Sequence, residues 1–160
     1  MKKKEFMSKP HQRIGSISNA HVGRDFENVA LKVFAGLGLK LEKNFKVPVG
    51  LNGTSKLHAF DLGCEEQKIL VECKSHKWTA PNDNVPSAKL TVWNEAMYYF
   101  LVAPSGFRKI LFVLKDLSDR RQETLAEYYI RTYRHLIPRD VEIWEFDESS
   151  GEVVERSFNQ

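Results

Sequence analysis

The chain has 160 residues, of which 42% are hydrophobic and 28% charged. This is an ordinary globular composition, and it predicts one domain with a sizeable core. No apolar run approaches about 18 residues, so neither a membrane-spanning helix nor a membrane partner is expected. The net charge of +3 is a mild positive bias that permits a nucleic-acid partner without demanding one.

The N-terminal residues 1–17 are basic and lack the apolar region of a secretory signal. We expect a disordered tail there and a single folded domain over residues 18–160. The two cysteines fit free thiols in a reducing cytosol, so a cytoplasmic location is expected. The side chains that a zinc site would recruit do not have the usual zinc spacing: these are His58, Cys64, Cys73 and His76.

The first half of the domain predicts a helix followed by three strands. The stretch 16–38 predicts a helix because its apolar residues recur at helical spacing, with Ser18 or Asn19 as the cap. Pro48 suggests that the first strand is an edge strand or carries a bulge. Short turns join the three strands, which should therefore form an antiparallel meander: residues 43–51, 56–64 and 68–75.

The second half alternates helices and strands. We expect a polar loop over 76–86, then a helix over 87–103 capped by Ser87, then an apolar strand over 109–115. A helix from about Arg120 to His135, capped by Ser118 or Asp119, is expected next. A strand over 141–147 and a short last strand within 151–158 complete the domain. A helix separates the third strand from the apolar strand, so these two are expected to be parallel. The sum is an α/β fold with a mixed central sheet flanked by helices.

Two carboxylates and a lysine meet in the second hairpin. Side chains alternate along a strand, so Glu72 and Lys74 share one face and Cys73 points to the other. A turn over residues 65–68 places Asp61 opposite Glu72, with Cβ atoms roughly 5 Å apart. Opposed like charges are destabilising, and Lys74 or a divalent cation would compensate them. Paired carboxylates beside a lysine suit metal-assisted hydrolysis of a phosphate ester.

The stretches "GRDFENVALKVF", "HAFDLG" and "ILVECK" together resemble the PD-(D/E)XK nuclease superfamily, the restriction-endonuclease-like fold. The resemblance implies an αβββαβ core and a nuclease-like domain that uses Mg²⁺ or Mn²⁺. It implies that Asp61 and Glu72 bind the metal, that the backbone carbonyl of Cys73 assists, and that Lys74 is the catalytic lysine. It also implies an accessory acid on the first helix, Glu27. The superfamily's proline is replaced here by a phenylalanine, at a position that the superfamily keeps loosely.

The expected function is that of a metal-dependent endonuclease that hydrolyses phosphodiester bonds in DNA, of the restriction type or the junction-resolving type. Cutting both strands needs two sites, which suggests a homodimer. Three further residues are candidates for nucleic-acid binding: Lys77 and Trp78 in the loop after the third strand, and Lys89 in the first turn of the second helix.

Other interpretations stay open at this point. The alternative function is a non-cleaving nucleic-acid-binding module on the same fold. The acidic and basic side chains of the hairpin could form a structural salt bridge, and Glu27 could be a plain surface residue. His58 and His76 are expected at the surface. Arginines interleaved with aromatic residues over 120–134 suit a nucleic-acid face, but we expect Tyr129 and Tyr133 to be core residues.

Overall fold

The structure is a computed structural model that describes residues 19–156. Its elements in chain order are α1 (Asn19–Gly36), β1 (Glu42–Val49), β2 (Lys56–Cys64), β3 (Ile69–Lys74), α2 (Ser87–Val102), β4 (Arg108–Leu114), β5 (Leu117–Ser118), β6 (Glu123–Thr124), α3 (Leu125–Tyr133), a 3₁₀ turn (Arg134–Leu136), β7 (Val141–Phe146) and β8 (Val153–Glu155). The tail predicted for residues 1–17 lies outside the described residues. No helix within the described part of the chain is both long and apolar enough to cross a membrane.

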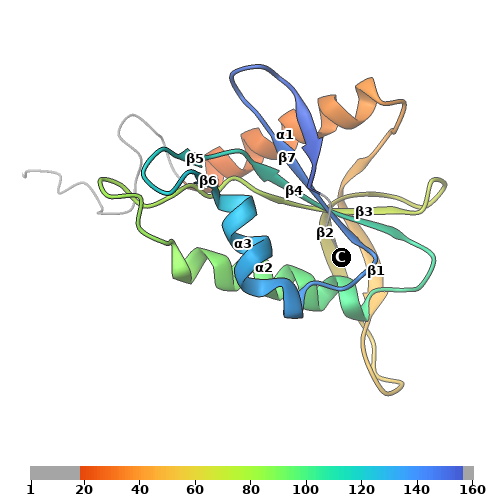
Figure 1. Cartoon of the computed structure of the whole chain (residues 1–160). Coiled ribbons are helices and arrows are strands. Elements are labelled where there is room, and N and C mark those ends of the chain that lie inside the picture. The colour runs from red at the N-terminus through yellow and green to blue at the C-terminus, as the bar shows by residue number, and fades with distance from the viewer. Residues whose placement is uncertain (1–18, 157–160) are drawn as a thin grey trace, which may run out of the picture.

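Six strands form one mixed sheet in the order β1-β2-β3-β4-β7-β8 (Figure 1). The first three strands are antiparallel neighbours, β3 and β7 both run parallel to β4, and β8 is antiparallel to β7. The predicted α/β class, the meander and the parallel pair are thus confirmed. Pro48 lies on β1 at the edge of the sheet, the position in a sheet where proline is tolerated.

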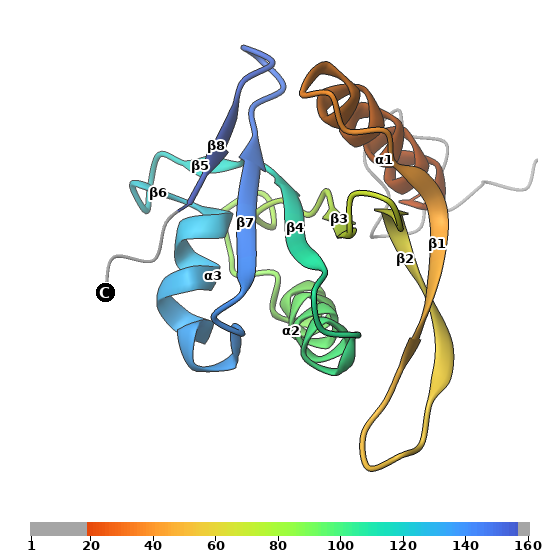
Figure 2. The same ribbon diagram turned by 90° about the vertical axis from the view of Figure 1, so that its right-hand side faces the viewer.

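Helices cover both faces of the sheet. Figure 2 shows α1 on one side and α2 with α3 on the other. Phe112 of β4 packs with Phe26 and Phe34 of α1, whereas Leu111 belongs to the cluster that contains Trp93 of α2. Six consecutive residues of β4 are buried, as expected for a parallel strand with both faces covered.

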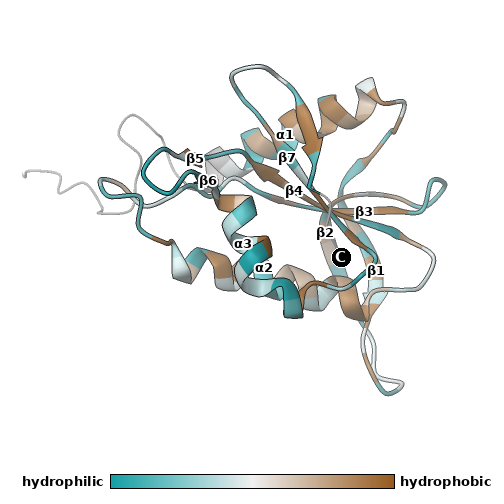
Figure 3. Ribbon diagram, in the orientation of Figure 1, coloured by the Kyte–Doolittle hydropathy of each residue, from teal (hydrophilic) through white to brown (hydrophobic). Residues whose placement is uncertain are grey.

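The second helix carries apolar residues on its outer side as well as on its buried side, and Figure 3 shows it as a mixture of brown, white and teal. Trp93 and Phe100 are fully buried under the sheet, whereas Leu101 on the outer side is 60% exposed. The predicted cap at Ser87 is wrong. Ser87 is the first helical residue, and Pro86 occupies the cap position without any side-chain capping bond. The Pro86 carbonyl accepts the N–H of Lys89.

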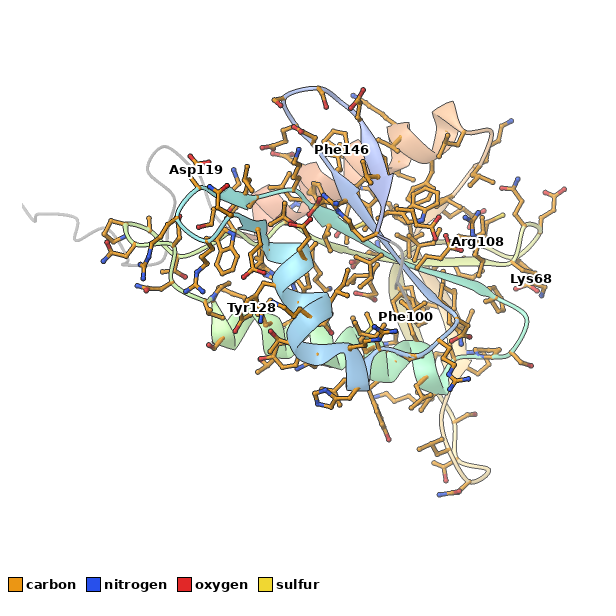
Figure 4. The ribbon with its side chains drawn as sticks, viewed as in Figure 1. Lys68, Phe100, Arg108, Asp119, Tyr128 and Phe146 are labelled. Carbon is orange, nitrogen blue, oxygen red and sulfur yellow. The ribbon has the colours of Figure 1, made fainter. Side chains whose placement is uncertain are left out.

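The third helix starts later than predicted. The chain from 117 to 124 forms the small β5–β6 hairpin, whose turn contains Asp119 (Figure 4), and the helix begins at Leu125. Thr124 is its cap and forms a capping box with Glu127, which satisfies two N–H groups at the helix start. Within the predicted helix Gln122 has φ +54°, so a continuous helix from Arg120 is not possible.

Candidate active site

The β2–β3 hairpin has the register that the sequence predicts. Cys64 pairs with Ile69 and Leu62 pairs with Val71, and the turn is closed by the Lys68 N–H and the Glu65 carbonyl. The ladder ends with the pair of Leu62 and Val71, so Asp61 and Glu72, the next residue on each strand, both lie directly beyond its end. Register is fixed by the length of the turn, which is why this relationship could be predicted.

Strand β2 changes faces at Asp61. Phe60 packs in the cluster under α2, and Leu62 packs in the cluster under α1, although residues two apart in a regular strand share a face. On the neighbouring strand, Asn44 has φ +51° and lies between the ladder pairs that flank Asp61. The twist at this point turns the Asp61 carboxylate toward β3, where Oδ2 accepts the backbone N–H of Cys73 at 2.7 Å.

Glu72 and Lys74 lie at the carboxyl end of β3 and share the face that α2 covers. The Lys74 Nζ is 2.8 Å from Glu72 Oε2 and 3.9 Å from Asp61 Oδ2. The side chains are 13% exposed for Lys74, 9% for Glu72 and 27% for Asp61. Cys73 packs against the α1 cluster on the opposite face, so only its backbone is available to the site. The three predicted side chains are therefore together, half enclosed, at a strand end.

Burial and neighbouring charges shift the pKa values of the two carboxyl groups in opposite directions. Burial and the charge of Glu72 raise the pKa of Asp61 to about 6, although Lys74 and the Cys73 N–H oppose the shift. Burial also disfavours ionised Glu72, but His58 and Lys74 outweigh it and lower the pKa of Glu72. Burial alone would lower the pKa of Lys74, yet the charges of Glu72 and Asp61 raise it. At neutral pH the site holds two carboxylates and one ammonium ion.

Glu27 lies on α1 close enough to act on this group. Its negative charge contributes to raising the pKa of Asp61, as the smallest of the causes. Its carboxylate is 3.7 Å from Lys43 Nζ on β1, and its side chain is 24% exposed. Glu27 is therefore partly buried, is paired with Lys43, and acts on Asp61 through its charge.

The residues present fit a hard divalent cation. No group of three or more His, Cys, Asp or Glu side chains within the described residues is arranged to hold a metal. Mg²⁺, however, usually takes only one or two carboxylates from a protein and completes its shell with water and phosphate oxygens. Asp61 and Glu72 supply that number, and burial together with the charge of Glu72 raises the pKa of Asp61, a cost that a bound cation would offset.

The expected nucleic-acid contacts are only partly available. The Trp78 ring is 7% exposed within the core, and its Nε1–H is donated to the Asp116 carbonyl at 3.0 Å. In this arrangement the Trp78 ring is not available for contact with a base. Lys77 is 40% exposed and 3.7 Å from Glu148, and Lys89 is exposed in the first turn of α2.

The arginines of the third-helix region and the histidines also differ from expectation. Arg120 and Arg121 lie in the β5–β6 turn, where they donate to loop carbonyls of residues 82 and 83, whereas Tyr129 is buried as predicted.

His58 is not a surface residue: its side chain is 22% exposed and its Nε2 lies 3.6 Å from Glu72 Oε1. The sequence signal was its position two residues before Phe60, on the inward face of β2. His76 accepts the Nε1–H of Trp93.

Comparisons of the chain with protein-family models, with curated proteins and with solved structures find no match. The class of protein that the fold defines is therefore an α/β protein with a mixed six-stranded sheet, and its activity has to be argued from the site.

Proposed function

We propose that this protein is a metal-dependent endonuclease of the PD-(D/E)XK type, built on a restriction-endonuclease-like core, that hydrolyses phosphodiester bonds in DNA. The observation that carries the proposal is the convergence of Asp61, Glu72 and Lys74 on adjacent strands β2 and β3. The order α1-β1-β2-β3-α2-β4 around them is the αβββαβ order that the resemblance in the sequence implies. Ligands of α/β sheets commonly bind outside the carboxyl ends of the strands, and β3 ends at Lys74.

Each residue of the site has a role in this chemistry. A bound Mg²⁺ or Mn²⁺ would lower the pKa of a water molecule and offset charge on the scissile phosphate. Asp61 and Glu72 would hold the metal with the Cys73 carbonyl, and Glu27 would act through water. Lys74, kept charged by the two carboxylates, would donate hydrogen bonds to the phosphate as negative charge develops on its oxygens.

The main competing interpretation is a purely structural ion cluster, as in a non-cleaving binding module. Such a cluster would be expected to stabilise the fold, but a partly buried ion pair is weak stabilisation. Here burial and Glu72 instead raise the pKa of Asp61 to about 6, so its ionised form is held at a cost to the folded state. Shifted pKa values of this kind are typical of functional sites.

Cleavage assays test the proposal directly. The protein is incubated with supercoiled, linear and branched DNA in EDTA, Mg²⁺ or Mn²⁺, and the same is done with Glu72→Gln and Lys74→Ala. We expect metal-dependent cleavage that falls at least about 100-fold in both variants. Glu66→Gln and Lys68→Ala change an exposed acid and an exposed lysine in the turn of the same hairpin, and they should cleave like the wild type.

The outcomes distinguish the alternatives. Cleavage that survives both site substitutions would place the activity elsewhere. Salt-sensitive DNA binding without cleavage on any substrate would instead favour the binding module. The substrate that is cut fastest separates a restriction-type enzyme from a junction-resolving one, and sedimentation of the active protein tests the proposed homodimer.

A further inference from the structure

Aromatic residues pack against the imidazole ring of His58 beside the site. The ring stacks on Tyr99 of α2 with 3.6 Å between ring centroids and an interplanar angle of 10°. It also meets Phe60 edge to face at 4.8 Å. Phe60 is itself stacked on Phe100 of α2. Two elements therefore fix the plane of the His58 ring, and the ring has little freedom to turn away.

This packing directs the Nε2 atom of His58 toward Glu72. His58 Nε2 is buried, has no hydrogen-bond partner among the described residues, and lies 3.6 Å from Glu72 Oε1. The other oxygen of the same carboxylate, Oε2, is bound by Lys74 at 2.8 Å. A buried polar atom without a partner is costly, and a shift of a few tenths of an ångström would give Nε2 an acceptor.

We propose that His58 is a positioning residue that orients the Glu72 carboxylate by donating its Nε2–H to Oε1. With Lys74 on Oε2, both oxygens of Glu72 are then held, and the plane of the carboxylate is set before a metal arrives. Partners of this kind behind a ligating group typically change metal affinity by about 10- to 100-fold. The role rests on the proposed function, since it matters for metal binding through Glu72.

The arrangement differs from ordinary core packing in a testable way. A phenylalanine at position 58 would preserve the stack on Tyr99 and the contact with Phe60, because its ring resembles imidazole in shape. It would remove both ring nitrogens, including the Nε2 donor. A packing residue would therefore tolerate His58→Phe, whereas a positioning residue would not.

Binding of Mn²⁺ alone, followed by the loss of its free-ion electron paramagnetic resonance signal, is the first test. We expect His58→Phe to remain folded and to bind Mn²⁺ about tenfold more weakly than the wild type. His58→Gln keeps a side-chain N–H donor and should recover part of the affinity. Tyr99→Phe keeps the stack and should bind like the wild type, whereas Tyr99→Leu should weaken binding.

Nitrogen NMR of the metal-free protein with ¹⁵N-labelled histidine is the second test. A proton on Nε2 of His58 supports the proposal. A ring protonated on Nδ1 alone overturns it, as does unchanged Mn²⁺ affinity in a folded His58→Phe variant. Wild-type protein that binds no Mn²⁺ overturns the proposed function together with this inference, whereas loss of the His58 effect alone leaves the proposed function standing.

Discussion

The Asp61 carboxylate accepts the backbone N–H of Cys73 at 2.7 Å, and this bond joins β2 and β3 one step beyond their last backbone pair. Because Cys73 lies between Glu72 and Lys74, the bond fixes the spacing of all three charged groups. The side chain of Asp61 thus stabilises the fold through the hydrogen bond of Oδ2, whereas its buried negative charge destabilises the fold. A substitution that removes only the charge separates these two effects.

We expect Asp61→Asn to stabilise the metal-free protein above pH 7 by about 1–2 kcal/mol. Asparagine keeps an oxygen for the Cys73 N–H but carries no charge. The pKa of Asp61 is raised to about 6 from 3.8, so the folded state binds this proton more tightly than the unfolded state. Stability is therefore lost as the pH rises from about 4 to about 6, and the cost persists at higher pH. The variant avoids this loss.

Urea unfolding in EDTA at pH 4.5, 6 and 8 measures this effect. The gain of Asp61→Asn should grow with pH, and Mg²⁺ should stabilise the wild type but not the variant. Asp119→Asn removes an exposed carboxyl group on the β5–β6 turn and serves as the control. A gain that is equal at all three pH values would show that the charge of Asp61 is not its source.

Lys74→Met should destabilise the metal-free protein by about 3 kcal/mol at pH 8. Methionine keeps the length of the side chain but leaves Glu72 and Asp61 without the ammonium ion that lies 2.8 and 3.9 Å from them. The loss should be smaller at pH 5, where protonated Asp61 no longer repels Glu72. Added Mg²⁺ should restore part of the stability, because it binds only the folded site.

Lys68→Met is the matched control for this prediction. Lys68 forms an ion pair with Glu65 in the turn of the same hairpin, but its side chain is 50% exposed. Exposed pairs of this kind contribute at most about 1 kcal/mol. If both variants lose the same stability in urea unfolding, and Mg²⁺ restores neither, the cluster around Lys74 is an ordinary surface ion pair.

The parts of the site that could be predicted are those that local rules determine. The turn of the hairpin sets the register, and alternation along β3 sets the common face of Glu72 and Lys74. The role of His58 could not be predicted, because it depends on the change of face at Asp61 and on the approach of Tyr99 from a distant helix. The spacing from Phe60 indicates only that residue 58 faces inward, and it does not indicate which group the ring meets there.

The start of the third helix was predicted wrongly, although its true cap has a local pattern in the sequence. The sequence predicts Ser118 or Asp119 as the helix cap, whereas the Ser118 hydroxyl donates to Asp83 of the preceding loop and accepts the N–H of Arg121 in the β5–β6 turn. The true cap was present in the sequence as Thr124 followed by Glu127, the spacing of a capping box. Two possible caps six residues apart cannot be ranked without the loop that contacts the first one.

Trp78 anchors its loop, and its substitution should affect stability more than DNA binding. Its backbone N–H donates to Asp116 Oδ2 at 2.7 Å, and its ring packs edge to face on Tyr128. Trp78→Phe keeps most of the buried ring, so DNA affinity by fluorescence anisotropy should stay within about twofold. Trp78→Ala should cost about 3–5 kcal/mol in urea unfolding. A folded Trp78→Phe variant with strongly reduced affinity would restore the base-contact hypothesis.

Gly63 fixes how β1 lies on the hairpin that presents the site. A Cβ atom added at Gly63 would come within 2.4 Å of the Phe45 ring, and Phe45 pairs with Phe60 across β1 and β2. We therefore expect Gly63→Ala to destabilise the protein by about 1–3 kcal/mol, and the double variant with Phe45→Ala to lose less than the sum of the single variants. Gly23→Ala is the control, since nothing lies within 4 Å of a Cβ there and alanine favours a helix by about 0.5–1 kcal/mol. Strictly additive losses in urea unfolding would mean that the Phe45 ring moves aside freely.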